Sequence, residues 1–284
     1  MKGIILAGGN GTRLHPLTIS YSKQLIPVFD KPLIYYPLST LISLNIKDIL
    51  VIVKADQLKN FQSLLKNGNQ FGVNISYAIQ NNANGIAEAL IIGKKFIKNE
   101  SVALILGDNI FYGQDLFKDI SFYKNKGSII FLYQVKNPSQ YGVARFKNNQ
   151  LFSIDEKPRK PKSDLAVTGL YIFDQSALSY VKKLKPSKRG ELEITDLNNI
   201  YIKSKKMNSI ILKNSSIWFD AGTTNSLLLA SQYVQAIQER NNILISSPEE
   251  ISFNKKNISK VKLMKYLEKK PNNSYYNYLI KIIS

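Results

Sequence analysis

The sequence predicts an α/β fold with a mixed, mainly parallel sheet that is flanked by helices. Short apolar runs alternate with helical patterns through the first half of the 284 residues. A glycine-rich turn directly follows the first apolar run, and shorter strands separated by turn residues occupy the middle of the chain. Helices between successive strands are typical of βαβ units, in which the strands run parallel.

Strand and helix alternate from residue 3 onward. Residues 3–7 are apolar and short enough for a buried strand, and residues 33–44 have the length of a helix, with Pro37 in or near its first turns. Further strands are expected at 48–53, 73–79 and 102–106, and further helices at 58–65 and 85–96. Because ligands bind beyond the carboxyl ends of such strands, we expect the chemistry to follow Ala7, Ile79 and Leu106.

The middle and the end of the chain show a different pattern. Turn residues such as Asn137 and Pro138 separate expected strands at 128–135, 143–146, 151–154 and 168–173, which indicates an antiparallel or mixed extension of the sheet. Helices at 178–184, 193–203 and 225–240 and short strands at 210–212 and 217–219 are expected next. Ser247, Pro248 and Glu250 have the N-cap, first and third positions of another helix. We therefore predict one large domain over residues 1–242 and a small helical appendage over 243–284.

Charge and rare residue types exclude several classes of function. The chain carries 39 Lys+Arg against 20 Asp+Glu, a net charge of +19. The lysines are scattered, and the arginines are Arg13, Arg145, Arg159, Arg189 and Arg240. This distribution indicates a compositional bias and disfavours a nucleic-acid partner, which would need a concentrated basic surface. Since the chain has no cysteine and one histidine, a disulfide or cysteine-ligated metal is excluded and a Ser–His–Asp site is disfavoured.

Signals for a membrane or for export are not found either. No run approaches the roughly 18–20 apolar residues that cross a bilayer. The segment from Met1 to Gly9 is too short and too rich in glycine for a secretory signal. We therefore expect a cytoplasmic protein without a membrane partner.

The glycine-rich turn reads Gly8-Gly9-Asn10-Gly11-Thr12-Arg13-Leu14. Glycines after a strand let the backbone approach phosphates and direct N–H groups toward them. The dinucleotide-binding pattern would need glycine where Leu14 stands, and the Gly-Lys-Ser/Thr of a Walker A loop is missing. The remaining interpretation is a phosphate-binding turn with two cations, Arg13 and Lys23. A turn that only ends the strand, without binding a ligand, would explain the glycines equally well.

Together with the segments that follow, this turn resembles the signature of the sugar-1-phosphate nucleotidylyltransferases. Residues 8–14, Pro16, Thr18 and the segment SKQLIPV at 22–28 carry the resemblance. Further blocks narrow it to the glucose-1-phosphate thymidylyltransferases: KPLIYYPLSTL at 31–41, LGDN at 106–109, YGV at 141–143, EKP at 156–158, VTGLY at 167–171, RGELEITD at 189–196 and WFDAGT at 218–223. The blocks follow in order across roughly residues 3–250. The resemblance implies the Rossmann-like fold of the nucleotide-diphospho-sugar transferases, with residues 1–242 as the catalytic domain.

The resemblance also implies a reaction, in which a thymidylyl group passes from dTTP to α-D-glucose 1-phosphate in the presence of Mg²⁺. Both substrates are polyanions, which repel each other unless cations intervene. The nucleophile is a phosphate oxygen that is already ionised, so the chemistry needs no catalytic base and gives His15 no evident role. Catalysis then consists of alignment and charge neutralisation at the α-phosphorus.

The same resemblance assigns roles to individual residues. It implies that Asp108 and Asp220 hold the metal, although an isolated aspartate after a strand is ordinarily a cap or turn residue. Arg13 and Lys23 are expected to stabilise the departing pyrophosphate, and Lys157 to hold the sugar phosphate. Nucleotide-binding positions are Leu6, Gly8, Gly9, Gly11, Thr12, Arg13, Lys23, Gln80 and Gly85. Positions that bind the sugar phosphate are Asn109, Tyr141, Gly142, Glu156, Lys157 and Val167.

One segment departs from the family pattern. Glu88 stands where glutamine is usual, and Asn84 stands where aspartate is usual. Glu88 lies one helical turn after Gly85, so it could face either the site or the solvent. A transferase of the same fold that uses UTP or another sugar 1-phosphate therefore remains an alternative.

Other classes of protein also share parts of this pattern. One is a nucleic-acid-binding protein or a non-catalytic sensor with a nucleotide pocket, and another is a glycosyltransferase of the same fold. Glycosyltransferases commonly use an Asp-x-Asp metal motif, whereas here Gly107, Asp108 and Asn109 are followed by Ile110. The resemblance finally implies a homotetramer with feedback at a second nucleotide site, and a place in dTDP-rhamnose synthesis for surface polysaccharide such as lipopolysaccharide O-antigen.

Overall fold

Parallel strands form the centre of the fold: β1 (Lys2–Ala7), β4 (Asp48–Val53), β5 (Asn74–Ile79) and β6 (Val102–Leu106). The computed structural model describes residues 1–113, 116–117, 120, 127–213 and 215–283. In it β1 lies between β4 and β6, and β5 forms one edge of the sheet. Ile4 and Ile5 pack into cores on opposite faces of the sheet, so both faces of β1 are buried. The apolar runs that predict these strands are therefore confirmed.

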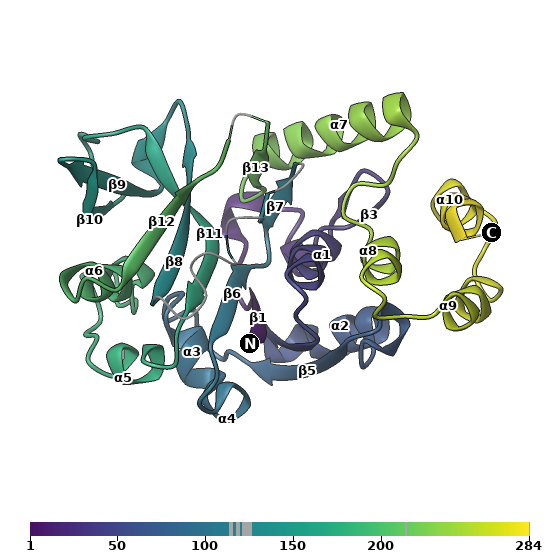
Figure 1. Cartoon of the computed structure of the whole chain (residues 1–284), viewed down its shortest axis with the longest axis horizontal. Coiled ribbons are helices and arrows are strands. Elements are labelled where there is room, and N and C mark those ends of the chain that lie inside the picture. Colours follow the sequence, from purple (N-terminus) through teal and green to yellow (C-terminus); the bar gives the residue numbers. More distant parts are fainter. Residues whose placement is uncertain (114–115, 118–119, 121–126, 214, 284) are drawn as a thin grey trace.

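Helices cover both faces of the sheet (Figure 1). One face carries α1 (Tyr35–Ser43) and α2 (Leu58–Leu65), and the other carries α3 (Glu88–Ile92), α4 (Lys94–Ile97), α5 (Ala177–Val181) and α6 (Ile194–Lys203). The single helix predicted over 85–96 is wrong. Gly85 has φ of 107°, a value outside the helical region, and the helix begins only at Glu88. A second interruption at Gly93 separates α3 from α4.

Antiparallel strands extend the sheet as predicted. They are β8 (Ser128–Gln134), β9 (Gly142–Lys147), β10 (Gln150–Glu156) and β11 (Leu165–Phe173), and β11 joins them to β6. A last strand, β12 (Met207–Ile211), runs parallel to β8. It begins three residues before the strand predicted at 210–212, because its side chains are half-buried and give only a weak apolar signal.

A small ribbon beside the main sheet was not fully foreseen. The strand predicted at 217–219 is confirmed as β13 (Ile217–Asp220). Its partner β7 (Asn109–Tyr112), which follows β6 after a two-residue turn, is not predicted by the sequence pattern. In this antiparallel pair Asn109 lies opposite Asp220. The ribbon packs with β2 (Pro27–Val28), β3 (Lys31–Pro32) and α7 (Thr224–Asn241) in a core of their own.

The segment after residue 242 continues with helices. The predicted N-cap is confirmed, since Ser247 Oγ accepts a hydrogen bond of 3.2 Å from the N–H of Glu250 at the start of α8 (Pro248–Asn254). α8 packs against α1, whereas α9 (Lys260–Leu267) and α10 (Ser274–Ile283) enclose a separate small core at one end of the molecule (Figure 1). The domain boundary between residues 242 and 243 stays a prediction.

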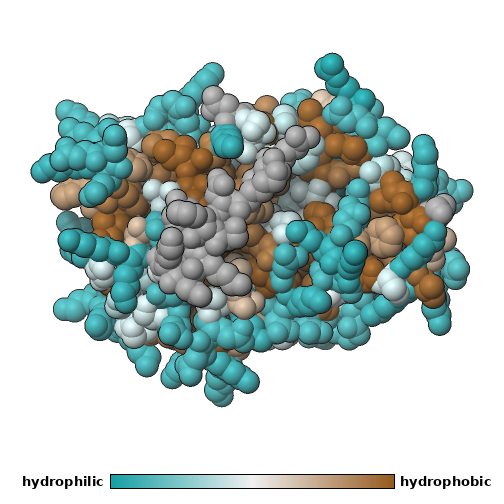
Figure 2. Space-filling view, in the orientation of Figure 1, coloured by the Kyte–Doolittle hydropathy of each residue, from teal (hydrophilic) through white to brown (hydrophobic). Residues whose placement is uncertain are grey.

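Polar residues are spread over the surface of the molecule. On the face shown in Figure 2, hydrophilic side chains occupy most of the outline and apolar residues form separate groups between them. Among the described residues, no helix combines the length and the apolar character that a membrane span requires.

Glu249 in α8 provides a test of how the C-terminal segment is held. Its side chain is fully buried, Oε2 accepts a hydrogen bond of 2.8 Å from the Tyr275 hydroxyl, and Oε1 has no partner in the described part of the chain. Burial raises the pKa of the Glu249 carboxyl, and this outweighs the opposing effect of the Tyr275 hydrogen bond. The fold therefore favours the protonated form, and the stability that this group contributes is lost as pH rises through its raised pKa.

We expect Glu249→Gln to stabilise the protein at pH 8 by about 1 kcal/mol, or about 2–4 °C in Tm, and to change little at pH 5. The neutral amide keeps an acceptor for Tyr275 without burying a charge. Thermal unfolding at both pH values measures this, with the exposed Glu239→Gln as a control. A lower Tm at pH 8 than in the wild type would mean that the buried charge stabilises the fold.

Candidate active site

One cavity of about 280 Å³ lies beyond the carboxyl ends of β1 and β5, where the sequence predicts chemistry. We call it cavity A. Of the predicted nucleotide-binding residues, those that line it are Leu6, Gly9, Arg13, Lys23, Gln80 and Gly85. Gly8, Gly11 and Thr12 belong to the adjoining turn but not to the lining.

A second cavity of about 170 Å³, cavity B, adjoins the first beside β10 and β11. All the residues predicted to bind the sugar phosphate line it: Asn109, Tyr141, Gly142, Glu156, Lys157 and Val167. Asp108 and Asp220 line it as well. Arg13 and Asp108 belong to the walls of both cavities, so an anion in one would lie close to an anion in the other.

The glycine turn gives each glycine a different role. A Cβ on Gly8 would lie 2.3 Å from Gln80 Oε1, so the missing side chain makes room for the Gln80 amide. Gly9 borders open space in cavity A, with no heavy atom within 4 Å of such a Cβ. Gly11 has φ of 64°, and its carbonyl oxygen accepts a hydrogen bond of 2.7 Å from Thr18 Oγ1.

Gly8→Ala should displace Gln80 and raise the KM for the nucleotide by about tenfold, the effect of one or two lost hydrogen bonds. The φ of Gly8 is one that alanine also adopts, so the backbone is not strained, but displacement of the buried Gln80 side chain should lower the Tm by about 2–4 °C. Steady-state kinetics with the second substrate saturating measures the change. If Gly8→Ala has the wild-type KM, Gln80 does not contact the nucleotide.

Asp220 is the last residue of β13, and Asp108 directly precedes β7, the strand that pairs with β13. The Ala221 N–H donates a hydrogen bond of 2.9 Å to the carbonyl oxygen of Asp108, and Asp220 pairs with Asn109. Lys23 forms an ion pair with Asp108 Oδ2. The two aspartates therefore lie close together in the fold, although 112 positions separate them in the sequence.

Asn109 orients Asp108. Its Nδ2 donates a hydrogen bond of 3.0 Å to Asp108 Oδ1, while its Oδ1 accepts from Trp218 Nε1 at 2.6 Å and from the Gly169 N–H at 3.0 Å. Trp218 is buried and packs edge-on against Tyr141. This network leaves one N–H of Asn109 for a ligand in cavity B.

The electrostatics of the two aspartates differ. Burial acts to raise the pKa of Asp108, but the ion pair with Lys23 and the hydrogen bonds from Lys23 and Asn109 outweigh it and hold this pKa below its usual value. Burial, followed by repulsion from Asp108, raises the pKa of Asp220 to about 6. Buried carboxylates that repel each other suit a cation bound between them. Among the described residues, no group of three or more His, Cys, Asp or Glu could hold a metal ion.

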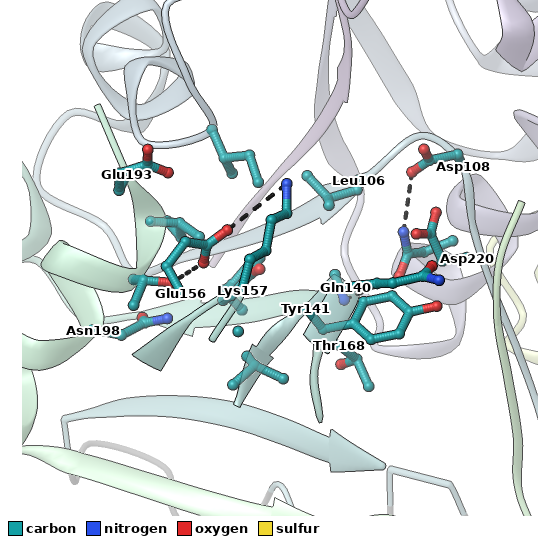
Figure 3. Close-up of a pocket in the computed structure, with 18 of the residues that line it drawn as sticks. Leu106, Asp108, Gln140, Tyr141, Glu156, Lys157, Thr168, Glu193, Asn198 and Asp220 are labelled. Carbon is teal, nitrogen blue, oxygen red and sulfur yellow. Dashed lines mark hydrogen bonds and ion pairs between the residues drawn. The ribbon is translucent and has the colours of Figure 1, made fainter. Parts of the chain in front are cut away.

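At the end away from the aspartates, Glu156, Glu193 and Lys157 line cavity B (Figure 3). Glu191 and Arg189 belong to the same lining. Glu156 Oε2 accepts a hydrogen bond of 2.5 Å from Thr195 Oγ1, and Glu156 Oε1 lies 3.9 Å from Lys157 Nζ. Lys157 is half-exposed and extends into the cavity, so its charge remains available to a ligand.

The sequence analysis did not assign Arg189, which also lines cavity B. Its Nη2 donates hydrogen bonds of 2.9 Å to both carboxylate oxygens of Glu193 and one of 3.4 Å to Glu156 Oε1. The signal was present, since Arg189 is one of few arginines and begins the RGELEITD block. Gln24, which lines cavity A and is 1% exposed, was likewise not assigned.

Gly85 joins the walls of the two cavities. A Cβ there would lie 2.4 Å from the carbonyl oxygen of Leu192, so only glycine permits this approach. The Ala87 N–H donates to Leu192 O at 3.2 Å, and the Leu192 N–H donates to Asn84 O at 2.7 Å. Because Leu192 lies close in sequence to Arg189, the wall of cavity B is hydrogen-bonded to the wall of cavity A.

The two residues that depart from the family pattern are linked to Gln80 by hydrogen bonds but line neither cavity. Glu88 Oε2 accepts a hydrogen bond of 2.8 Å from Gln80 Nε2, and Glu88 Oε1 accepts one of 2.8 Å from Asn84 Nδ2. Glu88 is half-buried, and its carboxylate is connected to the site through Gln80, which lines cavity A.

Comparison with known proteins identifies the family. The model of the nucleotidyl transferases matches residues 2–237. The chain belongs to the nucleotidyl transferase family. Among its relatives, the glucose-1-phosphate thymidylyltransferase of Neisseria meningitidis is 48% identical over 286 residues, covering 100% of this chain and 99% of that protein. The glucose-1-phosphate thymidylyltransferase of Mycolicibacterium smegmatis is 46% identical over 285 residues, covering 100% of this chain and 99% of that protein. The resemblance drawn from the sequence motifs is thus confirmed.

Solved structures of family members have the same fold. A protein of Bacillus anthracis assigned as a glucose-1-phosphate thymidylyltransferase is 42% identical with a TM-score of 0.77, covering 82% of this chain and 94% of that one. A UDP-glucose pyrophosphorylase in complex with UDP-glucose is 26% identical with a TM-score of 0.73, covering 83% and 98%. The mixed, mainly parallel sheet predicted from the sequence is therefore that of nucleotide-sugar pyrophosphorylases.

Proposed function

We propose that this chain transfers the thymidylyl group of dTTP to α-D-glucose 1-phosphate, forming dTDP-glucose and releasing pyrophosphate. The observation that supports this most directly is that cavities A and B meet at Arg13 and Asp108. A triphosphate in cavity A and a sugar phosphate in cavity B would therefore be neighbours. The relatives that cover the whole chain carry the name of this activity.

In the proposed reaction, a phosphate oxygen of glucose 1-phosphate forms a bond to the α-phosphorus of dTTP. The bond from this phosphorus to the oxygen that bridges to the β-phosphate breaks, and its electron pair leaves with pyrophosphate. Arg13 stands where both cavities meet, and its planar guanidinium can bind two phosphate oxygens at once. Lys23 adds charge on the nucleotide side, and Lys157 does so on the sugar side. These cations reduce the repulsion between the two anionic substrates.

The proposal includes a divalent metal, Mg²⁺, held by Asp108 and Asp220. The buried Asp108 and the half-buried Asp220 fit such an ion, because Mg²⁺ takes one or two protein carboxylates and completes its shell with phosphate oxygens and water. When bound, it supplies charge neutralisation at the phosphates. The residues themselves orient the site, since Asn109 and Lys23 fix the carboxylate of Asp108.

The runner-up is a transferase of the same fold that uses UTP, and the likeness to a UDP-glucose pyrophosphorylase favours it as the alternative. Pyrophosphate release over a panel of dTTP, UTP, dCTP and ATP with several sugar 1-phosphates, with and without Mg²⁺, separates the two. We expect the highest kcat/KM with dTTP and glucose 1-phosphate and no turnover after the metal is chelated. Preference for UTP would replace the proposal by its alternative.

Assembly and setting complete the proposal. We include a homotetramer, which is supported by apolar side chains exposed on α7, with Leu228 at 59% and Leu229 at 57%. Phe29, whose N–H donates to Ser231 Oγ at 2.8 Å, adds to the same surface. The reaction is proposed for the cytoplasm, where nucleoside triphosphates are available, and its product for deoxysugar synthesis such as that of dTDP-rhamnose.

A further inference from the structure

Cavity A has one charged end and one uncharged end. Arg13 and Asp108 belong to the wall that it shares with cavity B, and Lys23 is tied to this wall through its ion pair with Asp108. The rest of the lining includes Leu6 and Gln80 and is free of charged residues apart from Glu191, which the two cavities share. Because the phosphates of a nucleotide need the cations, its base must occupy the uncharged end. Two amide side chains, Gln24 and Gln80, belong to this part of the lining. Gln24 Oε1 already accepts a hydrogen bond of 2.5 Å from Ser22 Oγ, which leaves the amide of Gln80 to read a base edge.

The amide of Gln80 is held in one orientation. A carboxylate can only accept hydrogen bonds, so Glu88 Oε2 can be reached only by the amide nitrogen of Gln80, at 2.8 Å. If the amide turned over, its carbonyl oxygen would face the carboxylate, and two acceptors would repel each other. Glu88 is itself held, since its other oxygen accepts from Asn84 at 2.8 Å.

The side chain of Gln80 also has little freedom to move away. It is 4% exposed, and its carbonyl oxygen lies directly over Gly8, where no side chain intervenes. In the described part of the chain this oxygen accepts no hydrogen bond, and one of the two amide hydrogens remains after Glu88 has taken the other. Gln80 therefore presents an acceptor and a donor side by side, in a fixed order.

From this geometry we infer that Glu88 is a positioning residue that makes the site select thymine and uracil against cytosine. Thymine and uracil present an N3–H donor beside the O4 acceptor, which matches the acceptor and donor of Gln80. Cytosine presents the N3 acceptor beside the N4 donor, which is the reverse order and matches only a Gln80 amide that has turned over. A site that holds its hydrogen-bonding groups rigidly rejects the mismatched ligand strongly. This inference rests on the proposed function, since it assumes a pyrimidine nucleotide in cavity A.

The test compares three variants. Glu88→Met has a similar shape and helix propensity but offers no acceptor, so the Gln80 amide becomes free to turn over. Glu88→Gln restores an acceptor oxygen, and Asn84→Ala removes the outer hydrogen bond while keeping the contact between Glu88 and Gln80. For each variant, kcat/KM is measured with dTTP, dUTP and dCTP, and Kd for the same nucleotides is measured by calorimetry, which does not require turnover.

We expect Glu88→Met to reduce the preference for dTTP over dCTP by about tenfold, in both kcat/KM and Kd, mostly through KM. The ratio of dTTP to dUTP should stay as in the wild type, because these bases share the edge that Gln80 reads. Glu88→Gln should recover most of the preference, and Asn84→Ala should retain it.

A parallel loss of affinity for all three nucleotides in Glu88→Met would overturn the inference, because it would show a purely structural role. An unchanged ratio of dTTP to dCTP would overturn it as well. The proposed function is judged separately, by pyrophosphate release from dTTP and glucose 1-phosphate in the wild type. The Kd ratios report on Glu88 whether or not that turnover is found.

Discussion

Asp108→Asn should reduce pyrophosphate release by about 10²–10³-fold, the effect of removing a charge that organises the transition state. The asparagine keeps the size of the side chain and one acceptor, but it loses the negative charge that Lys23 and a divalent ion require. Stopped assays of pyrophosphate with dTTP and glucose 1-phosphate, over a range of Mg²⁺ concentrations, measure the change. More Mg²⁺ should restore little of the activity.

The matched control for this substitution is Asp164→Asn. Asp164 is exposed and lines neither cavity, so its variant should have wild-type turnover. Near-wild-type turnover in Asp108→Asn itself would contradict the assignment of the metal to the Asp108–Asp220 pair.

Lys157→Ala should raise the KM for glucose 1-phosphate by about 10–100-fold, the range expected for a charge-assisted hydrogen bond to a phosphate. Lys157 lines cavity B and not cavity A, so the KM for dTTP should change little. Bisubstrate kinetics, with each substrate varied at saturating levels of the other, separates the two effects.

Lys160→Ala is the control for Lys157→Ala, because Lys160 is an exposed lysine nearby that lines neither cavity. It should leave both KM values unchanged. An effect of Lys157→Ala that is confined to dTTP would mean that this lysine serves the nucleotide and not the sugar phosphate.

The sequence predicts the strands of this fold better than the details of the site. The parallel strands β1, β4 and β6 are apolar runs with both faces buried, so each can be recognised locally. By contrast, β7 is short, begins with the polar Asn109 and exists because it pairs with β13 more than a hundred residues later. Long-range pairing of this kind leaves no periodic pattern in the sequence.

The helix predicted over 85–96 fails for a related reason. Its apolar spacing is helical, but Gly85 is drawn away by contact with the backbone of Leu192, which lies far along the chain. A tertiary contact thus overrides the local pattern. The role of Arg189 was missed in the same way, because its hydrogen bond to Glu156 forms only when β10 and the loop before α6 come together.

The site residues themselves could be placed from sequence because they occur in blocks that resemble a family. All six positions expected around the sugar phosphate line one cavity, among them Tyr141 and Val167. Composition alone could not identify these residues, because a chain with 39 Lys+Arg gives no means of distinguishing Lys157 from the other lysines. Contacts that are particular to this chain, such as that of Glu88 with Gln80, needed the structure.

The junction at Gly85 has a consequence for ligand binding in the two cavities. The turn before α3 and the loop before α6, which carries Arg189, are joined by backbone hydrogen bonds to Leu192. A shift of one of these segments therefore disturbs the other. A ligand that orders the turn before α3 also orders the segment that carries Arg189. A second ligand that binds beside this segment then loses less conformational entropy on binding. Such a coupling is reciprocal, so a ligand beside either segment would favour binding beside the other.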